Sequence, residues 1–272
     1  MKKNTFGIFL LTLFLFFLLS GCARNSSDLD IAVFSDVHGK DVSGFIDKLP
    51  ESIDIIIVPG DISEHFRNDI DDKHEIKSIL EGLTETGKDM YLIPGNHDRL
   101  NDIKKAINEI NSPLIHDMID NNVLELDDYR FLFIPGYHLR ELSADGAYIY
   151  DKNDLDNLED KIDNTKINII VSHGPPRIGN IDLTLSGENV GDIMLTDFIK
   201  KNNINFGIFG HIHEAVGGVN IDDKEIIEKI FSDSLFVNSG SVLEWERNDG
   251  KTNSNIVIIR FDGKKASYEI VE

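Results

Sequence analysis

Five short clusters of Asp, Asn and His side chains stand out in the sequence, and each follows directly after an apolar run of strand length. They read Asp36-Val37-His38, Gly60-Asp61, Gly95-Asn96-His97-Asp98, Ser172-His173-Gly174 and Gly210-His211-Ile212-His213. The donors that they offer are carboxylates, an amide and imidazoles. Such mixed oxygen and nitrogen donors suit divalent Mn, Fe, Zn or Co better than Mg or Ca, which prefer shells made of oxygen alone.

The number of donors favours two metal ions over one. Two carboxylates, one amide and four imidazoles are too many for a single tetrahedral ion, but they suit two ions that share a bridging group. Asp61 is the candidate bridge, because a carboxylate has two oxygens and Gly60 lets the backbone come close. Two ions roughly 3.5 to 4 Å apart form a clamp for in-line displacement at phosphorus, so the sequence predicts phosphate ester hydrolysis.

Strands and helices must alternate to bring these clusters together. The predicted strands are 30–34, 53–58, 90–93, 123–126, 130–134, 167–171, 206–209, 235–237 and 255–261. Apolar residues repeat with helical spacing in three segments between them, 76–83, 103–110 and 194–199. This order predicts one mixed α/β domain over residues 29–272. Because the carboxyl ends of strands in such a sheet meet at one edge, we expect the five clusters to converge there.

The five clusters, taken in this order, resemble those of the calcineurin-like metallophosphoesterase superfamily. The resemblance runs from Asp36 to His213. A related segment follows at Asn238-Ser239-Gly240-Ser241, with serine where relatives often have proline. The resemblance implies a four-layer αββα sandwich with two mixed β-sheets and a metal site at the carboxyl ends of the strands.

The resemblance also implies roles for individual residues. It implies two metal-binding triads and a bridge: Asp36, His38 and His213 for one ion, Asn96, His173 and His211 for the other, and Asp61 between them. His97 would protonate the leaving oxygen, and Asp98 would orient it and stabilise its charge. The implied nucleophile is a hydroxide held between the two ions.

The segments beside the clusters narrow the substrate. Ile62-Ser63-Glu64 lacks the Asp-Arg pair that follows this point in protein serine/threonine phosphatases. The segment His173–Arg177 is more similar to the bacterial phosphodiesterase-like branch. We therefore expect a small phosphodiester, or a small phosphomonoester, as substrate. Candidate contacts to its oxyanions are Arg99, Arg177 and Arg67, each of which could instead be a solvated surface arginine.

Two other classes of protein stay open at this point. The chain could be a non-catalytic metal-binding scaffold of the same fold, although a scaffold has no reason to keep His97. It could also be a nuclease that acts on short oligonucleotides. Outside the clusters, His138 follows a predicted strand end and is a lesser candidate for the pocket. His65, His74 and His116 are expected at the surface, and Trp245 is expected to pack rather than recognise.

The charge of the chain limits its partners. With 27 Lys and Arg against 48 Asp and Glu, the formal charge of the 272 residues is −21. Binding a duplex backbone needs a basic footprint, so long nucleic acid is disfavoured as a partner. With 41% hydrophobic residues the chain can bury a substantial core.

The N-terminus has the layout of a bacterial secretory signal. Two lysines precede an apolar run over residues 6–19, which is short for a membrane-spanning helix. The run ends in Leu19-Ser20-Gly21-Cys22, which resembles a lipoprotein lipobox. We expect residues 1–21 to be a signal peptide, Cys22 to be lipidated and residues 22–28 to be a tether. An uncleaved anchor helix is the alternative. Either way the body would lie outside the cytoplasm, attached to a membrane of a bacterial cell envelope.

Overall fold

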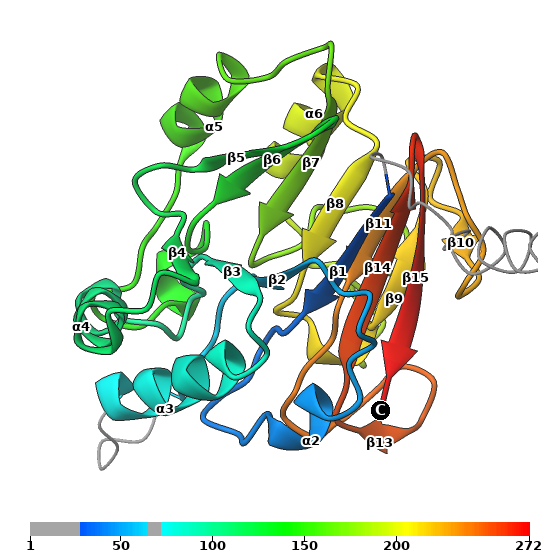
Figure 1. Ribbon diagram of the computed structural model, residues 1–272. Helices are drawn as coiled ribbons and strands as arrows, with labels where there is room; N and C mark the ends of the chain where they lie inside the picture. Colours follow the sequence, from blue (N-terminus) through cyan, green and yellow to red (C-terminus); the bar gives the residue numbers. More distant parts are fainter. Residues whose placement is uncertain (1–27, 65–71) are drawn as a thin grey trace, which may run out of the picture.

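The computed structural model describes residues 28–64 and 72–272 and has two large β-sheets packed face to face, with helices on their outer sides (Figure 1). This architecture confirms the expected four-layer αββα sandwich with two mixed sheets. The predictions for the signal peptide, Cys22, Arg67 and His65 lie outside the described residues. Within the described ranges, no helix combines the length and the apolar character needed to cross a membrane.

The first sheet has the strand order β15–β14–β1–β2–β3–β4. Its strands are β1 (Asp28–Val33), β2 (Ile55–Val58), β3 (Asp89–Leu92), β4 (Ile115–Asp117), β14 (Ile256–Asp262) and β15 (Lys265–Val271). The strands β1 to β4 run parallel, whereas β14 and β15 are added antiparallel at one edge. In β1, Ile31 and Val33 face the second sheet and Ala32 faces the helices. Both faces of β1 are therefore buried, which explains its continuous apolar sequence.

The second sheet has the order β10–β9–β11–β8–β7–β6–β5. Its strands are β5 (Val123–Leu126), β6 (Tyr129–Ile134), β7 (Ile167–Ser172), β8 (Phe206–Phe209), β9 (Gly217–Val219), β10 (Glu225–Ile226) and β11 (Leu235–Asn238). The four central strands β6, β7, β8 and β11 are parallel. Their carboxyl ends face the same end of the sandwich as those of β1, β2 and β3 (Figure 1).

Helices cover the outer faces of the two sheets, and a small hairpin lies apart. They are α2 (Ser43–Ile46), α3 (Asp72–Thr84), α4 (Leu100–Ile110), α5 (Lys152–Glu159) and α6 (Ile193–Lys201), with the 3-10 turns η1 (Arg140–Leu142) and η2 (His213–Ala215). α3 and α4 pack on the first sheet, and α5 and α6 on the second. The strands β12 (Trp245–Glu246) and β13 (Thr252–Asn253) form the hairpin.

Several elements were not predicted because their sequences carry little apolar periodicity. These are α2, α5, β4, β9, β10, β12, β13 and β15. β15 lies at a sheet edge and mixes polar with apolar residues. α5 has only Leu155 and Leu158 as buried apolar residues, and a capping box at Asp151 defines its start. Short edge strands and polar helices are stabilised by their neighbours more than by their own pattern.

Candidate metal centre

The five polar clusters converge, as the sequence predicts, at the carboxyl ends of five strands. Two donors follow β1, one follows β2, one follows β3, one follows β7 and two follow β8. Because β1, β2 and β3 belong to one sheet and β7 and β8 to the other, the centre lies where the two sheets open at one end of the sandwich. Neither sheet could assemble this group of side chains alone.

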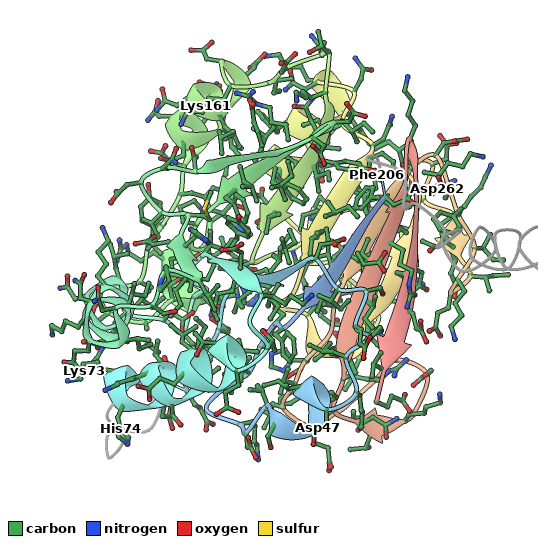
Figure 2. All side chains as sticks on the ribbon, viewed as in Figure 1. Asp47, Lys73, His74, Lys161, Phe206 and Asp262 are labelled. Carbon is green, nitrogen blue, oxygen red and sulfur yellow. The ribbon has the colours of Figure 1, made fainter. Side chains whose placement is uncertain are left out.

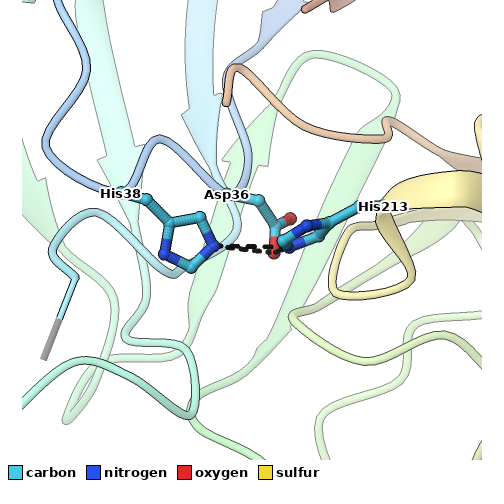
Figure 3. A group of neighbouring side chains, drawn as sticks. All are labelled: Asp36, His38 and His213. Atoms are coloured by element: carbon cyan, nitrogen blue, oxygen red, sulfur yellow. Dashed lines mark hydrogen bonds and ion pairs between the residues drawn. The ribbon is translucent and has the colours of Figure 1, made fainter. Parts of the chain in front are cut away.

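The first group of donors is formed by Asp36, His38 and His213 (Figure 3). The Nε2 atoms of His38 and His213 lie 3.3 Å apart, and Nε2 of His213 lies 3.0 Å from Oδ1 of Asp36. Nε2 of His38 is 3.9 Å from the same carboxylate oxygen. Two ring nitrogens and one oxygen thus face one point.

The second group is formed around Asp61 and His173. Nε2 of His173 lies 3.2 Å from Oδ2 of Asp61 and 2.8 Å from Oδ1 of Asn96. A ring nitrogen of His211 lies within 4.8 Å of ligand atoms of Asp61 and His173. Asp61 also groups with His38 on the other side of the cluster, so its carboxylate lies between the two sets of donors.

The spacing of these donors fits shared metal ions. Ligand bonds of about 2.1 Å place neighbouring donors roughly 3.0 to 3.4 Å apart in tetrahedral or octahedral coordination. Four of the donor separations in the two groups run from 2.8 to 3.3 Å, and His38 Nε2 lies 3.9 Å from Asp36 Oδ1. The chemistry of the donors, two carboxylates, an amide oxygen and four imidazoles, fits divalent transition metals.

The carboxylates and the imidazoles in the centre shift one another's pKa values. Burial would raise the pKa of Asp61, but His173 outweighs burial and holds that pKa well below 3.8. Burial would likewise raise the pKa of Asp36, which His213 instead keeps below its usual value. Burial lowers the pKa of His173, yet Asp61 raises it to about 9. Each carboxylate therefore favours the protonated form of the imidazole that it faces, and a divalent cation can replace such a proton.

The half-buried His211 differs from His173. Burial, aided by the charge of His173, lowers the pKa of His211 to about 3. Burial also lowers the pKa of His38. Both rings are therefore neutral at physiological pH, and a ring nitrogen on each keeps a lone pair for a metal ion.

The backbone is strained where it presents the ligands. Four of the seven predicted ligands have positive φ angles: Asp36 (51°), His38 (48°), Asp61 (53°) and His211 (68°). Such conformations are uncommon for residues other than glycine, and they cluster at functional sites. Gly95 matters for a steric reason, because a Cβ atom there would lie 2.1 Å from Oδ1 of Asp61. These backbone conformations direct the donor side chains toward one another.

Main-chain carbonyls hold two of the ligands in place. The Asn96 side-chain nitrogen donates to the carbonyl oxygen of Leu142 at 2.6 Å, which turns the amide oxygen of Asn96 toward His173. Nδ1 of His173 lies 3.0 Å from the carbonyl oxygen of Pro59. This contact fixes the ring so that Nε2 faces the centre.

The segment Asn238-Ser239-Gly240-Ser241 forms hydrogen bonds to the backbone next to the first group of donors. The Ser241 hydroxyl donates to the carbonyl oxygen of Asp36 at 2.9 Å. The backbone N–H of Ser239 donates to the carbonyl oxygen of Phe209 at 2.8 Å. Proline at position 239 would lack that N–H, so the serine gives β8 and β11 an additional link.

His97 lies at the edge of the centre, but Asp98 does not pair with it in the way the sequence suggested. The backbone N–H of His97 donates to Oδ1 of Asp61 at 2.8 Å, and its Nε2 lies 3.8 Å from Oδ2 of Asp61. The buried Asp98 carboxylate instead accepts hydrogen bonds from the backbone N–H groups of Ile62, Ser63 and Gly95. Asp98 therefore joins the loops after β2 and β3, and Asp61 is the carboxylate next to His97.

The predicted substrate contacts are dispersed. Arg99 is exposed and immediately precedes α4. The Arg177 guanidinium donates to the carbonyl oxygen of Asn189 and lines a cavity of about 930 Å³ that none of the predicted ligands lines. His138 packs against Tyr137 at 4.5 Å between ring centroids and lies 4.0 Å from Asp192. The structure thus brings the metal ligands together but does not bring the two arginines into that cluster.

Two aromatic residues at the centre were not predicted. The ring of buried Tyr137 lies 4.2 Å from the ring of His211. The ring of Trp245 meets the ring of His213 edge-on, with 4.8 Å between the ring centroids. Trp245 was expected to be a packing residue, but it stays 41% exposed. Asn248 of the β12–β13 hairpin donates through its backbone N–H to the carbonyl of Glu214, which fixes the hairpin beside η2. No local pattern in the sequence signals this approach.

The fold and the two donor groups are those expected of a phosphoesterase that binds metal ions, and comparison with known proteins identifies the family. The family profile described as calcineurin-like phosphoesterase matches residues 29–215. The chain therefore belongs to the calcineurin-like phosphoesterase family, as its sequence clusters suggested.

Individual relatives are more distant. The chain is 28% identical over 172 residues to a protein of Coxiella burnetii that is named a probable cyclic nucleotide phosphodiesterase. The match spans 59% of this chain and 60% of the relative. Among solved structures, TT1561 of Thermus thermophilus matches with a TM-score of 0.62 and 14% identity, over 90% of this chain and 99% of that one. PhoD matches with a TM-score of 0.50 and 9% identity, over 90% of this chain and 68% of that one. These structures share the fold.

Proposed function

We propose that this phosphoesterase is a two-metal phosphodiesterase that acts on small substrates. The observation that carries the proposal is the position of Asp61, whose carboxylate groups with His173 and His211 on one side and with His38 on the other. A carboxylate between two sets of donors is what a bridged pair of metal ions requires. Two bound ions would lower the pKa of a water molecule and neutralise charge on the phosphate oxygens.

The exposure of each side chain indicates whether it would bind a metal ion or contact the substrate. The side chains of Asp61 and His173 are 1% and 0% exposed, which suits ligands that substrate does not touch. The His97 side chain is 19% exposed and lies at the edge of the same cluster. It is therefore placed to reach the leaving oxygen of a bound ester and donate a proton to it.

Three observations favour a small organic phosphodiester as the substrate. Trp245 beside His213, and Leu142 beside Asn96, expose apolar surface close to the donors. The Coxiella burnetii relative is named for activity on cyclic nucleotides, which are small phosphodiesters with a planar ring. The net charge of −21 opposes long polyanions. A small diester with an organic group is the substrate that fits all three.

Hydrolysis assays test this proposal. The full-length protein, purified in detergent and supplied with Mn²⁺, should cleave bis-p-nitrophenyl phosphate and cyclic adenosine monophosphate faster than p-nitrophenyl phosphate. A chelator should abolish the activity. A preparation with two bound metal ions that cleaves no ester would contradict the proposal and favour a scaffold. Faster cleavage of a short oligonucleotide than of either diester would favour a nuclease.

The envelope location is a separate proposal, supported by the sequence around Cys22. Cells that express the chain should incorporate radioactive palmitate into the protein, and Cys22→Ser should abolish the label. Equal label in both proteins would overturn lipidation at Cys22. Because no assay of hydrolysis enters this experiment, its result is independent of the proposed activity.

A further inference from the structure

A turn on the side of the sandwich exposes three large apolar side chains within five residues. Ile227, Ile230 and Phe231 are 74%, 56% and 42% exposed. They make up three of the nine exposed large hydrophobic residues in the described part of the chain. Turns usually carry Gly, Asn, Asp or Ser, so this choice of residues is unusual. Contiguous exposed apolar surface marks a contact with another apolar body.

The turn is held in a fixed shape, so its apolar tips cannot fold back. The backbone N–H of Ile230 donates to the carbonyl of Ile227 at 3.1 Å, and Lys229 has a φ of 64°. The backbone N–H of Lys229 donates to the carbonyl of Tyr268 in β15 at 2.8 Å. Ser232 then pairs with Ala266, which attaches the turn to the edge of the first sheet.

The two charged side chains of the turn are exposed and pair with the neighbouring strand β15. The Glu228 carboxylate accepts a hydrogen bond from the backbone N–H of Ile270 at 2.8 Å. The Lys229 ammonium pairs with Glu269 at 3.0 Å. Both charges are engaged with β15, and the three apolar side chains are left as the exposed apolar face of the turn.

The turn lies along β15, and its last part reaches the end of the sandwich where β1 begins. Asp28, the first residue of β1, is opposite Asp262 of β14, which is opposite Lys265 of β15, and Ala266 follows beside Ser232. Three strand spacings therefore separate Asp28 from Ser232, the residue that follows the turn, which is roughly 14 Å. Asp262 marks this end in Figure 2.

We propose that Ile227, Ile230 and Phe231 dock on the surface of a lipid bilayer, beside the point where the anchored segment joins the body. The inference goes beyond catalysis and rests only on the proposed membrane attachment. A tether of residues 22–28 reaches about 20 Å when extended, which is enough to place the turn on the same membrane. Apolar side chains exposed this close to the anchor would lie at the lipid surface.

Tryptophan quenching by brominated lipid tests the docking. The only tryptophan of the chain, Trp245, lies at the metal centre and provides the matched control. The full-length protein and the double variant Phe231→Trp/Trp245→Phe are reconstituted into phosphatidylcholine vesicles with brominated or ordinary acyl chains. We expect brominated lipid to quench the tryptophan introduced at position 231 and to leave Trp245 unquenched.

Two further measurements complete the test. The tryptophan at position 231 should lose its quenching when Ile227→Ser and Ile230→Ser are added, with an unchanged circular dichroism spectrum. Equal quenching at positions 231 and 245, or none at position 231, would overturn the docking. Vesicle flotation reports attachment separately, and a protein that does not float with the vesicles would overturn both attachment and docking while leaving the hydrolase proposal untouched.

Discussion

The backbone N–H of His97 donates a hydrogen bond to Oδ1 of Asp61 at 2.8 Å, so the carboxylate that lies between the two donor groups also sets the position of the proposed acid. The two residues follow neighbouring parallel strands, β2 and β3. In the proposed mechanism, the Asp61 side chain thus couples metal binding to leaving-group protonation. This coupling makes distinct predictions for the two residues.

Replacing Asp61 should disrupt both functions at once. In Asp61→Asn the amide cannot supply two anionic oxygens between the donor groups, so we expect fewer than two bound metal ions. Loss of charge stabilisation at the reacting phosphate should lower kcat by about 1000-fold. Metal analysis and steady-state kinetics on the same preparation check this. Two tightly bound ions in the variant would show that Asp61 does not bridge.

Replacing His97 should separate metal binding from proton transfer. His97→Ala is expected to keep its metal ions but to lose about 100-fold in kcat for esters with alkoxide leaving groups. The loss should be small for p-nitrophenyl esters, whose leaving group needs no proton. Because His97 also groups with His38 and Asp61, metal content must be measured. Loss of metal in His97→Ala would identify the residue as a ligand.

Replacing Asp98 should lower the stability of the protein rather than impair proton donation by His97. Asp98→Ala leaves the buried N–H groups of Ile62, Ser63 and Gly95 without an acceptor. We expect the free energy of unfolding to fall by about 3 kcal/mol, as measured by urea denaturation. Asp98→Asn, which keeps one acceptor oxygen, should lose less. A shifted pH profile of kcat with unchanged stability would instead support the role first expected beside His97.

Trp245 should contribute to binding of the organic part of the substrate. Its exposed ring against His213 offers a stacking surface, so Trp245→Ala should raise KM for a cyclic nucleotide about 10-fold with little change in kcat. Trp245→Phe should retain most of the affinity. Glycerophosphocholine, which has no ring, serves as the control substrate. An equal rise in KM for both substrates would indicate a general disturbance of the site.

The convergence of the candidate ligands could be predicted from the sequence because each of them comes just after a strong apolar strand. Asp36, Asp61 and His173 follow buried parallel strands whose direction sets where their side chains go. The roles of Leu142 and Pro59 could not be predicted, because they act through main-chain carbonyls that any residue possesses. A carbonyl partner is visible only when the fold is known.

The errors in the prediction also have physical causes. Asp98 was paired with His97 on the family resemblance, whereas its carboxylate accepts hydrogen bonds from the backbone N–H groups of Ile62, Ser63 and Gly95. Trp245 was missed because β12 has two residues and reaches His213 only through the hairpin's attachment to η2. Both depend on contacts between segments that are distant in sequence, and local pattern carries no record of them.

The stability of the metal-free protein should depend on pH through His173. Its folded pKa of about 9 lies above the usual 6.5, because Asp61 outweighs burial. The stabilisation that results from this raised pKa is fully present below pH 6.5 and is lost as the pH rises through about 9. The shift corresponds to on the order of 3 kcal/mol. At the acid end, the lowered pKa of Asp61 means that its contribution is present above pH 3.8 and is lost as the pH falls through its folded pKa.

Urea unfolding of the chelated protein at pH 5.5 and pH 9.5 measures this difference, with His173→Gln as the control that should show a smaller decline. Bound metal ions should reverse the trend, because they compete with protons for His173 and bind more tightly as the pH rises. Unfolding free energies of the chelated wild type that match at the two pH values would contradict the predicted ion pair between His173 and Asp61. An equal decline in wild type and His173→Gln would assign the effect to other groups.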